Sequence, residues 1–186
     1  GESIEALKNE SQHMKELVEQ LLFLARGDSG RQHLNMERTD INRMVSEGWE
    51  ESMMIDENHR YEFKGTKSEA CVNGDVAMIK QCVRIFVQNA AKYSEPGTTI
   101  KLGVSDEAGY VSYLIEDEGT GMESSDIIHI FDRFYRSDEA RNGETGGSGL
   151  GLSIAKWIVD AHGGTIQVIS RADIGSRFIV RFPKLR

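Results

Sequence analysis

Residues 147–152 read Gly147-Ser148-Gly149-Leu150-Gly151-Leu152 and run directly into a helical pattern over 150–162. Small residues expose backbone N–H groups, and a helix N-terminus adds unpaired donors and partial positive charge. The segment therefore predicts a phosphate-binding loop. It is not a P-loop, because no Gly-Lys-Ser/Thr is present, and its GxGxG spacing differs from the GxGxxG of dinucleotide-binding folds. The alternative interpretation is a flexible loop whose glycines only allow helix packing.

A second glycine segment, Asp117-Glu118-Gly119-Thr120-Gly121, follows an apolar strand pattern over 110–115. An acidic residue at the end of a central strand can accept a hydrogen bond from an exocyclic amine. Two glycines would let a planar base approach the backbone. An EF-hand loop is excluded because positions 119 and 121 are Gly rather than oxygen ligands. The alternative is a turn with a solvated Asp117.

A polar face marks the end of the helix predicted over 75–93. Asn89, Lys92 and Tyr93 are spaced i, i+3 and i+4, so they share one side of that helix. An amide oxygen can ligate Mg²⁺, and an ammonium group can neutralise phosphate. Each residue taken alone is more typical of a polar helix surface than of a binding site.

An aromatic cluster, Ile130-Phe131-Asp132-Arg133-Phe134-Tyr135-Arg136, lies in an otherwise glycine-rich region. Its aromatic rings could anchor a loop to the core. Arg133, Arg136 and Arg141 place positive charge where a polyphosphate would use it. The alternative is an ordinary short helix with one core Phe, near 126–134.

Composition narrows the class of protein. The 186 residues carry 22 Lys plus Arg and 30 Asp plus Glu, a net charge of −8, which argues against a nucleic-acid or anionic-membrane surface. Cys71 and Cys82 match no zinc pattern and form no disulfide framework, which favours a reducing compartment. There is no apolar run of 18 residues, so we expect a soluble domain.

The remaining periodicities predict the fold class. Helices are expected over 3–26, from a cap at Asp40 to Ile55, and over 75–93 and 150–162. Strands occur in neighbouring pairs rather than alternating with helices, which predicts an α+β sandwich with a mostly antiparallel sheet. A linker is expected over 27–39. Strands are expected over 61–64, 70–72, 98–104, 110–115, 165–170 and 177–182.

The first helix has a coiled-coil-like pattern. Its apolar or small residues recur at three- and four-residue spacing, the seam of a helical bundle that needs a partner. The alternative is a surface helix on a globular core. Gly27 stands where a C-terminal cap is expected. The seam residues are Ile4, Leu7, Ser11, Met14, Val18, Leu21 and Ala25, and Leu17, Leu22, Phe23 and Leu24 widen the apolar face.

Four motifs in this order resemble the catalytic and ATP-binding domain of bacterial sensor histidine kinases. That domain belongs to the Bergerat-fold superfamily, with type II topoisomerase, a heat-shock chaperone and mismatch-repair ATPases. The resemblance implies a two-layer sandwich whose mixed, mostly antiparallel sheet is covered by three helices. Residues 85–93 resemble the N box, 117–121 the first glycine box, 130–136 the F box and 147–152 the second glycine box.

The resemblance also implies a domain organisation. Residues 1–26 are similar to the second helix of the dimerisation and phosphoacceptor hairpin, an N-terminal bundle helix. A linker would span 27–40, and the catalytic domain would span 41–186.

Site roles follow from the resemblance. Asp117 would bind the adenine amino group, with Gly119, Gly121 and Ser176 nearby. Asn89 would hold Mg²⁺, and Lys92, Tyr93 and Arg136 would contact phosphates or ribose. Residues 122–148 would form the ATP lid. The phosphate cradle would comprise Gly147, Ser148, Gly149, Leu150, Gly151 and Leu152.

Two positions depart from the family pattern. Ile85 stands where the family usually has a second Asn and where hydrolytic relatives have a Glu, so steady ATP hydrolysis is not expected and magnesium binding is expected to be weaker. No histidine is followed by the acidic residue of a phosphoacceptor. His13, whose next residues are Met14 and Lys15, is interpreted as a surface residue, and His33, His59, His129 and His162 also lack that context.

The implied function is a kinase core that binds Mg–ATP or ADP and donates the γ-phosphoryl group to an upstream histidine. Its partners would be the phosphoacceptor helix and a response regulator, with no nucleic acid and no direct membrane contact. It would be a cytoplasmic domain of a parent protein in the bacterial cell membrane. The alternatives are a nucleotide-sensing or partner-docking module without phosphotransfer, and a serine kinase of the anti-sigma type, against which the F box and the first helix argue.

Overall fold

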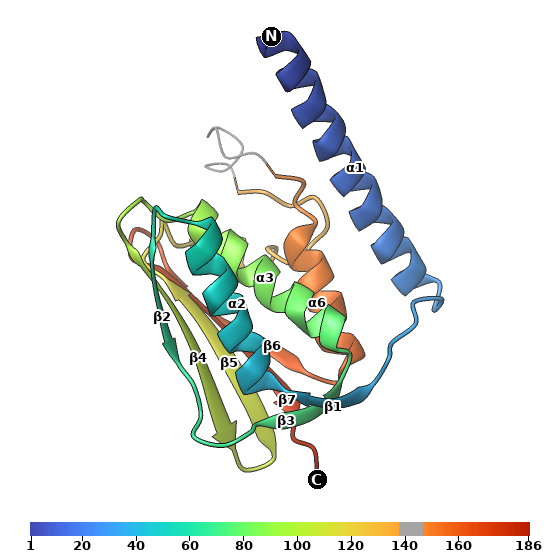
Figure 1. Cartoon of the computed structure of the whole chain (residues 1–186), viewed down its shortest axis with the longest axis vertical. Coiled ribbons are helices and arrows are strands. Elements are labelled where there is room, and N and C mark those ends of the chain that lie inside the picture. The colour runs from blue at the N-terminus through green and yellow to red at the C-terminus, as the bar shows by residue number, and fades with distance from the viewer. Residues whose placement is uncertain (138–146) are drawn as a thin grey trace.

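The computed structural model describes residues 1–137 and 147–186. A five-stranded sheet forms one layer and helices α2, α3 and α6 form the other, while α1 projects beside them (Figure 1). Arg141 and part of the proposed lid lie outside the described residues. The helices are α1 (Glu2–Asp28), α2 (Ile41–Ile55), α3 (Val76–Lys92), α4 (Ser124–Ile127) and α6 (Gly151–Ala161).

The sheet confirms the predicted α+β class. Its strand order is β2-β4-β5-β7-β6, with β2 parallel to β4 and all other pairs antiparallel; β1 and β3 form a separate antiparallel pair. The strand pattern over 110–115, which was expected to be a central strand, corresponds to β5, the middle strand of this order. The strands are β1 (Glu37–Asp40), β2 (Arg60–Lys64), β3 (Cys71–Gly74), β4 (Thr99–Glu107), β5 (Tyr110–Asp117), β6 (Thr165–Arg171) and β7 (Gly175–Pro183).

Two aspartates begin helices and also tie them to distant segments. The Asp40 carboxylate accepts the Asn42 N–H at 3.1 Å and the Ala70 N–H at 3.0 Å. Asp75 caps α3 by accepting the Met78 N–H at 3.0 Å. Because cap residues satisfy otherwise unpaired backbone donors, α2 and α3 begin where the sequence predicted.

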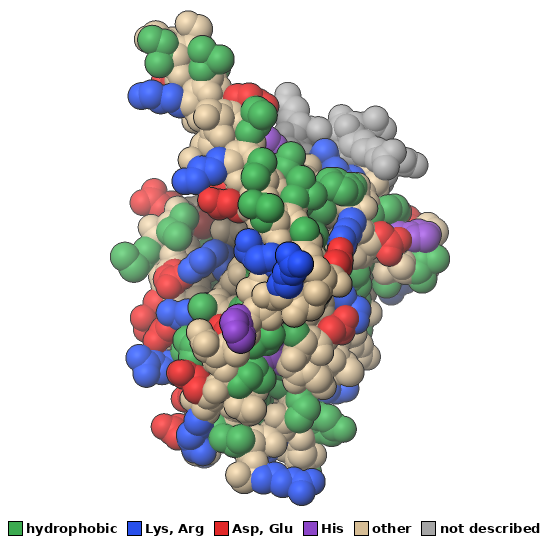
Figure 2. Space-filling model, turned by 90° about the vertical axis from the view of Figure 1, so that its right-hand side faces the viewer, with side chains coloured by type: hydrophobic (Ala, Val, Ile, Leu, Met, Phe, Trp, Pro, Cys, Tyr) green, Lys and Arg blue, Asp and Glu red, His purple; other side chains and the backbone are tan. Residues whose placement is uncertain are grey.

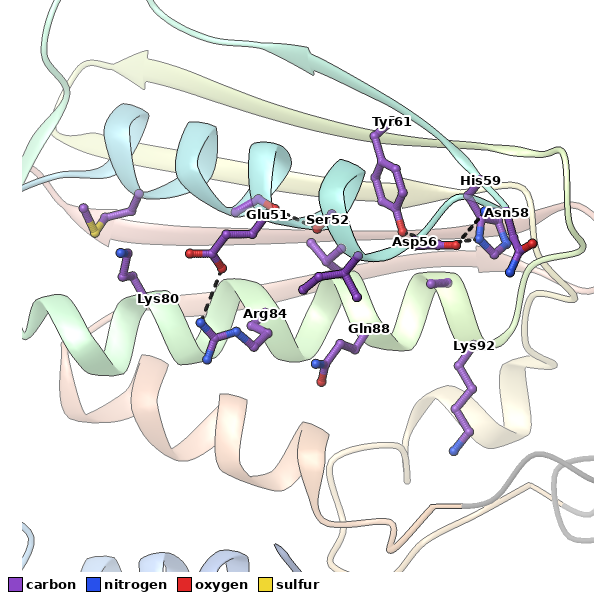
Figure 3. Close-up of a pocket in the computed structure, with 15 residues that line it drawn as sticks. Glu51, Ser52, Asp56, Asn58, His59, Tyr61, Lys80, Arg84, Gln88 and Lys92 are labelled. Carbon is purple, nitrogen blue, oxygen red and sulfur yellow. Dashed lines mark hydrogen bonds and ion pairs between the residues drawn. The ribbon is translucent and has the colours of Figure 1, made fainter. Parts of the chain in front are cut away.

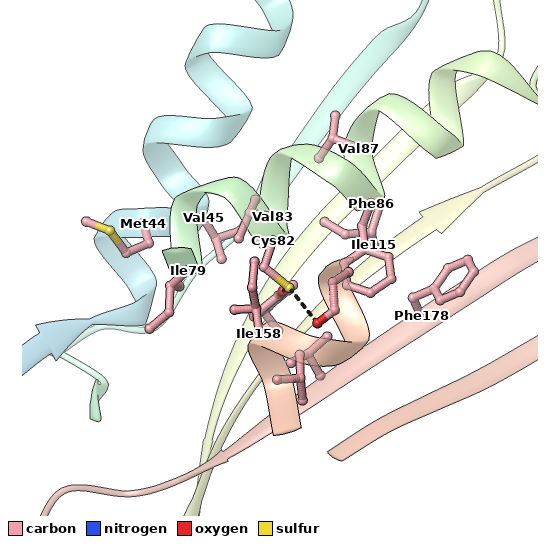
Figure 4. Packing of buried hydrophobic residues seen from close by; sticks show 14 of the residues in the cluster. Met44, Val45, Ile79, Cys82, Val83, Phe86, Val87, Ile115, Ile158 and Phe178 are labelled. Atoms are coloured by element: carbon pink, nitrogen blue, oxygen red, sulfur yellow. Dashed lines mark hydrogen bonds between the residues drawn. The ribbon is translucent and has the colours of Figure 1, made fainter. Parts of the chain in front are cut away.

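The core lies between the helices and the sheet (Figure 4). Ile79, Val83 and Phe86 of α3 are fully buried or nearly so, as their spacing predicted, and the Phe86 ring lies 5.0 Å from that of Phe178 in β7. By helical spacing Met53 shares a face of α2 with the buried Val45, but Met53 is 41% exposed. The last turn of α2 borders an open groove rather than the core.

Two local expectations need adjustment. β4 was expected to end at residue 104 but extends to Glu107, where it pairs with Tyr110. The helical stretch expected near 126–134 is the four-residue α4 followed by turns.

The first helix does not stop at Gly27, as was expected. It continues to Asp28, and the left-handed residue that follows is Gly30, with φ +70°. A Cβ at position 27 would lie 2.4 Å from the Trp157 indole nitrogen of α6. Gly27 is therefore needed because two helices pack closely there, not because the helix ends.

The C-terminal end of α1 packs against the domain, whereas the apolar seam along the rest of the helix is exposed. Near its C-terminus Phe23 and Leu24 are buried, and the Phe23 ring meets Trp157 edge-on at 5.3 Å. Both oxygens of Asp28 accept from the guanidinium of Arg133, at 2.6 and 2.7 Å. The seam itself is exposed, at 59% for Ile4, 70% for Leu7, 59% for Met14 and 52% for Val18.

Figure 2 shows apolar side chains among charged ones on the projecting end of the molecule. A surface helix packed on a globular core therefore describes only the C-terminal end of α1, where Phe23 and Leu24 are buried. A partner helix along the seam stays a prediction.

Candidate functional site

A cleft opens where the C-terminal end of α3, the end of β5 and the start of α6 meet. It has two adjoining cavities of about 750 and 390 Å³, which share Asn89, Lys92, Tyr93 and Arg136. The larger cavity adds Asp117, Gly121 and Ser176, and the smaller adds Gly147, Ser148, Gly149 and Gly151, while both include Leu152. The structure thus brings twelve of the predicted site residues to one cleft.

Asp117 is the acidic group of the larger cavity and is 7% exposed. Its Oδ1 accepts the N–H groups of Gly119, at 2.8 Å, and of Ser176, at 3.3 Å. Within residues 1–137 and 147–186, Oδ2 accepts no hydrogen bond. β-Sheet register places this carboxylate, because Asp117 of β5 pairs with Ser176 of β7. One oxygen is therefore held by the fold while the other is available to a ligand.

Burial controls the charge of Asp117. It raises the pKa of the carboxyl group, the Gly119 and Ser176 hydrogen bonds lower it, nearby Glu116 raises it, and the net direction is upward. A bound hydrogen-bond donor would favour the ionised form, so the site is suited to an amine of the ligand.

The glycines after Asp117 let three backbone segments meet. Gly121 has φ +63°, and a Cβ there would lie 1.9 Å from the Arg171 carbonyl oxygen. A Cβ on Gly119 would lie 2.4 Å from the Tyr93 carbonyl oxygen, which accepts the Thr120 N–H at 3.1 Å. These glycines were expected to admit a planar base; the structure shows that they also admit the protein's own backbone.

Cations line the junction of the two cavities. Lys92 is half-buried, and no carboxylate of the described chain forms an ion pair with it. Burial and the Arg136 guanidinium both lower the Lys92 pKa. Two neighbouring cations, one of them a lysine without a carboxylate partner in residues 1–137 and 147–186, favour a polyanionic ligand.

The second glycine segment is shaped by the aromatic cluster. Gly149 has φ +72°, a Cβ there would lie 2.7 Å from the Phe134 backbone, and its carbonyl accepts the Phe134 N–H at 3.0 Å. The Ser148 hydroxyl donates to Gln20 of α1 at 2.8 Å and accepts the Leu150 N–H at 3.3 Å. The predicted loop therefore precedes α6 and also touches α1.

Two predicted site residues line neither cavity. The Leu150 side chain is fully buried in the core, so only its backbone could serve a ligand. Gly119 lies beneath the loop, against Tyr93 and Asp117. Both stand next to lining residues, and sequence adjacency alone does not distinguish a lining residue from its support.

Several residues that line the cavities were not among the predicted binding residues, and Met122 and His13 are two examples. Met122 follows the first glycine segment and lines the larger cavity, so its adjacency was an available signal. His13 is exposed, as predicted for a surface residue, yet it lines the smaller cavity together with Glu16 and Gln20. No sequence signal pointed there, because the position of His13 depends on how α1 packs.

A protein-family comparison agrees with this geometry. The family described as histidine kinase-, DNA gyrase B-, and HSP90-like ATPase matches residues 74–186. The chain belongs to this ATPase family. The match contains every predicted site residue, and it confirms the resemblance inferred from the four motifs.

Individual relatives of the ATPase-family chain are sensor kinases. This chain is 37% identical over 181 residues to the sensor histidine kinase YkoH of Bacillus subtilis. The aligned region is 97% of this chain and 39% of YkoH. The chain thus spans about two fifths of that relative's length.

Solved structures agree. Mycobacterial sensor histidine kinase MprB superposes with a TM-score of 0.70 at 26% identity, covering 80% of this chain and 97% of that one. Full-length ShkA in complex with AMPPNP superposes with a TM-score of 0.84 at 24% identity, over 96% of this chain and 37% of that one, and shows the fold.

The ATPase-family site contains few metal-ligand candidates. Within residues 1–137 and 147–186, no group of three His, Cys, Asp or Glu residues could hold a metal ion. Ile85 lines the smaller cavity, and its methyl group would lie 3.6 Å from a Cβ at Gly151, so it contributes apolar packing. Asn89 remains the candidate oxygen ligand. In the same described ranges, no helix is long and apolar enough to cross a membrane.

Proposed function

We propose that this domain binds Mg–ATP and donates the γ-phosphoryl group to a histidine of a dimerisation helix. The observation that supports this most directly is Asp117, which lines a cavity of about 750 Å³ and has one oxygen tied to the backbone, while its other oxygen accepts no hydrogen bond from the described residues. Adenine presents an exocyclic amine that such an oxygen can bind. The cations Lys92 and Arg136 lie along the same cavity, where the phosphates would follow.

Each part of the nucleotide would have its own protein groups. Asp117 would accept from the adenine amine, Lys92 and Arg136 would neutralise phosphate charge, and the Gly147–Gly151 loop would donate backbone N–H groups. Phosphoryl transfer depends mainly on positioning and charge neutralisation. The proposal therefore requires no general base in this chain.

The fit to magnesium rests on the chemistry of Asn89. Mg²⁺ in nucleotide sites usually keeps several waters and takes one or two protein oxygens plus phosphate oxygens. The Asn89 amide supplies one such oxygen, and Ile85 supplies none. The metal, when bound, would neutralise charge on the phosphates. We therefore expect binding that depends on the nucleotide.

The wider role follows from the relatives. We infer a kinase core of a two-component sensor whose partners include the phosphoacceptor helix of its dimerisation domain and a response regulator. A cytoplasmic location beneath a membrane-bound parent belongs to the same proposal. The alternative, a nucleotide-sensing or partner-docking domain without transfer, is favoured by one observation: Ile85 replaces a family metal ligand.

Asn89→Ala should separate metal binding from base binding. We expect Mg²⁺ to strengthen binding of a non-hydrolysable ATP analogue to the wild-type chain, and the variant to lose most of that gain, about tenfold, because one oxygen ligand is lost. Metal-free ADP affinity should change less than about threefold. Calorimetric titration with and without Mg²⁺ measures both. Equal Mg²⁺ dependence in the variant would remove Asn89 from the metal site.

Phosphotransfer should require a separate acceptor. With labelled ATP, the chain should not form stable phosphohistidine on itself, but should label a dimerisation hairpin that carries an acceptor histidine. Because His13 lines the smaller cavity, His13→Gln is the matched control, and it should not alter transfer. Label on the chain that disappears in His13→Gln would contradict the proposal. Nucleotide binding without labelling of a cognate hairpin would support the nucleotide-sensing alternative.

A further inference from the structure

A partly buried histidine–aspartate pair lies where α2 ends and β2 begins (Figure 3). The His59 side chain is 7% exposed and that of Asp56 19%. The His59 Nδ1 atom lies 2.6 Å from Asp56 Oδ2, and its Nε2 atom lies 3.0 Å from the carbonyl oxygen of Ser94. This cluster belongs to none of the four motifs.

Both partners of His59 are hydrogen-bond acceptors. A neutral imidazole has one N–H, so only the doubly protonated ring can satisfy both. His162 offers a contrast within the same chain, because its Nδ1 faces the Ile158 carbonyl at 2.6 Å while its Nε2 accepts the Asp75 N–H at 3.0 Å. A neutral ring suffices at His162, whereas the geometry at His59 calls for a cation.

Asp56 is equipped to remain ionised beside that cation. Its carboxylate also accepts the Tyr61 hydroxyl at 2.6 Å and the Asn58 N–H at 2.9 Å. Burial alone would raise the pKa of Asp56, but these hydrogen bonds and His59 lower it on balance. Burial alone would lower the pKa of His59, but its contacts with Ser94 and Asp56 outweigh burial and raise it.

Other charged groups around the pair are engaged elsewhere. Arg84 and Glu51 line the same groove and pair with each other at 3.4 Å, and Lys80 at its far end pairs with Glu47 at 2.8 Å. Figure 3 shows Lys92 directed away from the His59 ring. Tyr61 contributes its hydroxyl from β2. In the described part of the chain, Asp56 is therefore the carboxylate that faces His59.

The Ser94 carbonyl connects this pair to the cleft. Tyr93 and Ser94 both line the larger cavity, and the Ser94 hydroxyl donates to the Ala90 carbonyl at 2.7 Å. The preceding carbonyl, that of Tyr93, accepts the Thr120 N–H at 3.1 Å, which holds the glycine segment beside Asp117. A displacement of the 93–94 backbone would therefore reach the segment that positions Asp117.

We propose that His59, held between Asp56 and the Ser94 carbonyl, is a positioning residue of the nucleotide pocket that acts in its protonated form. When the ring loses a proton, the shorter bond to the charged Asp56 should retain the remaining N–H. The Nε2 lone pair would then face the lone pairs of the Ser94 carbonyl, and the 93–94 backbone would move. Nucleotide affinity should therefore fall as pH rises through the pKa of His59. The inference rests on the proposed nucleotide function.

The test compares ADP dissociation constants by calorimetry from about pH 5.5 to about pH 9, a range that spans the ordinary histidine pKa. The wild-type chain should bind about three- to tenfold more tightly than His59→Gln at low pH, and the two should converge at high pH. Ionisation of the ADP phosphates is common to both proteins and cancels in the ratio. His33→Gln, at an exposed histidine, is the matched control and should follow the wild type.

A second variant tests the charge itself. Asp56→Asn removes the carboxylate but retains His59, so the midpoint of the affinity change should move to lower pH. A purely structural role of His59 would leave that midpoint unchanged. A ratio of wild-type to His59→Gln affinity that does not vary with pH would overturn the inference.

An NMR titration of the free chain keeps the inference separate from the proposed function. The Thr120 amide signal should follow the His59 ring titration in the wild type and not in His59→Gln. If the wild-type chain bound no nucleotide, the proposed function would fail, and a Thr120 signal indifferent to His59 would overturn the positioning link by itself.

Discussion

Asp117→Asn is expected to reduce nucleotide affinity on the order of 100-fold or more while leaving the fold intact. The substitution keeps the shape of the side chain and an oxygen that can still accept from Gly119 and Ser176. It replaces the open oxygen by an NH₂ donor, which would face the donor of the adenine amine. A hydrogen bond to a charged group contributes about 1.5–3 kcal/mol, and a donor facing a donor adds to that loss.

The matched control is the neighbouring carboxylate. Glu116→Gln removes a negative charge one residue away, but Glu116 is partly exposed and pairs with Arg177 on the outer surface of the sheet. Its nucleotide affinity should stay within about twofold of the wild type, because exposed ion pairs contribute little. Equal losses in Asp117→Asn and Glu116→Gln would mean that general charge, rather than the open oxygen, controls binding.

The pKa direction of Asp117 predicts the accompanying pH dependence. Since burial raises the pKa of this carboxyl group, it takes up a proton at a higher pH than an ordinary Asp. Wild-type affinity should therefore fall on acidification before most carboxylates protonate, and Asp117→Asn should lack that fall. Because the folded chain binds this proton more tightly than the unfolded chain, ionisation of Asp117 opposes folding. Asp117→Asn should accordingly be at least as resistant to urea as the wild type near neutral pH.

Gly121→Ala is expected to lower the free energy of unfolding by about 2–5 kcal/mol. An L-residue in the left-handed region costs about 1–2 kcal/mol. At Gly121 the new Cβ would also lie 1.9 Å from the Arg171 carbonyl oxygen, which is backbone and cannot rotate away. The glycine segment would have to move, so we expect an additional loss of about 1–3 kcal/mol.

Gly109→Ala is the control that carries the conformational cost without the steric contact, so its difference from Gly121→Ala measures the steric contribution. Gly109 has φ +86° in the β4–β5 turn, and a Cβ there would meet no atom within 4 Å. It should lose only the conformational part, about 1–2 kcal/mol, and should bind nucleotide normally. Urea unfolding and ADP titration of both variants measure the difference. Equal stability losses would show that the contact between Gly121 and Arg171 contributes nothing.

Much of the fold was predictable from local patterns. Helix caps at Asp40 and Asp75, the helical spacing of Ile79, Val83 and Phe86, and the paired strands each depend on neighbours a few residues away. The polar face of Asn89, Lys92 and Tyr93 was predictable for the same reason, because one helix turn brings these side chains together. The order of the four motifs then indicated the ATPase family.

Other features depended on contacts between distant segments. Gly27 was expected to end a helix, yet it lies inside α1, where it packs against Trp157, a residue 130 positions later in the chain. Leu150 was expected in the phosphate cradle, yet its side chain is in the core. The residues around Gly27 are compatible with a helix end or with close helix packing, and those around Leu150 with a binding loop or with the core. Only the packing of distant segments distinguishes these roles.

The sequence by itself determined most of the helices and strands, most of their apolar faces, and which chemical groups stand near their ends. Hydrophobic periodicity and capping act over one or two turns and are therefore visible in a linear string. The tertiary structure alone decided that Asp117 lies beside Ser176, that His13 reaches the cleft, and that His59 lies between Asp56 and Ser94. Periodicity specifies that a face must be covered but not what covers it, because the partner is selected by shape and hydrogen bonding across the whole fold.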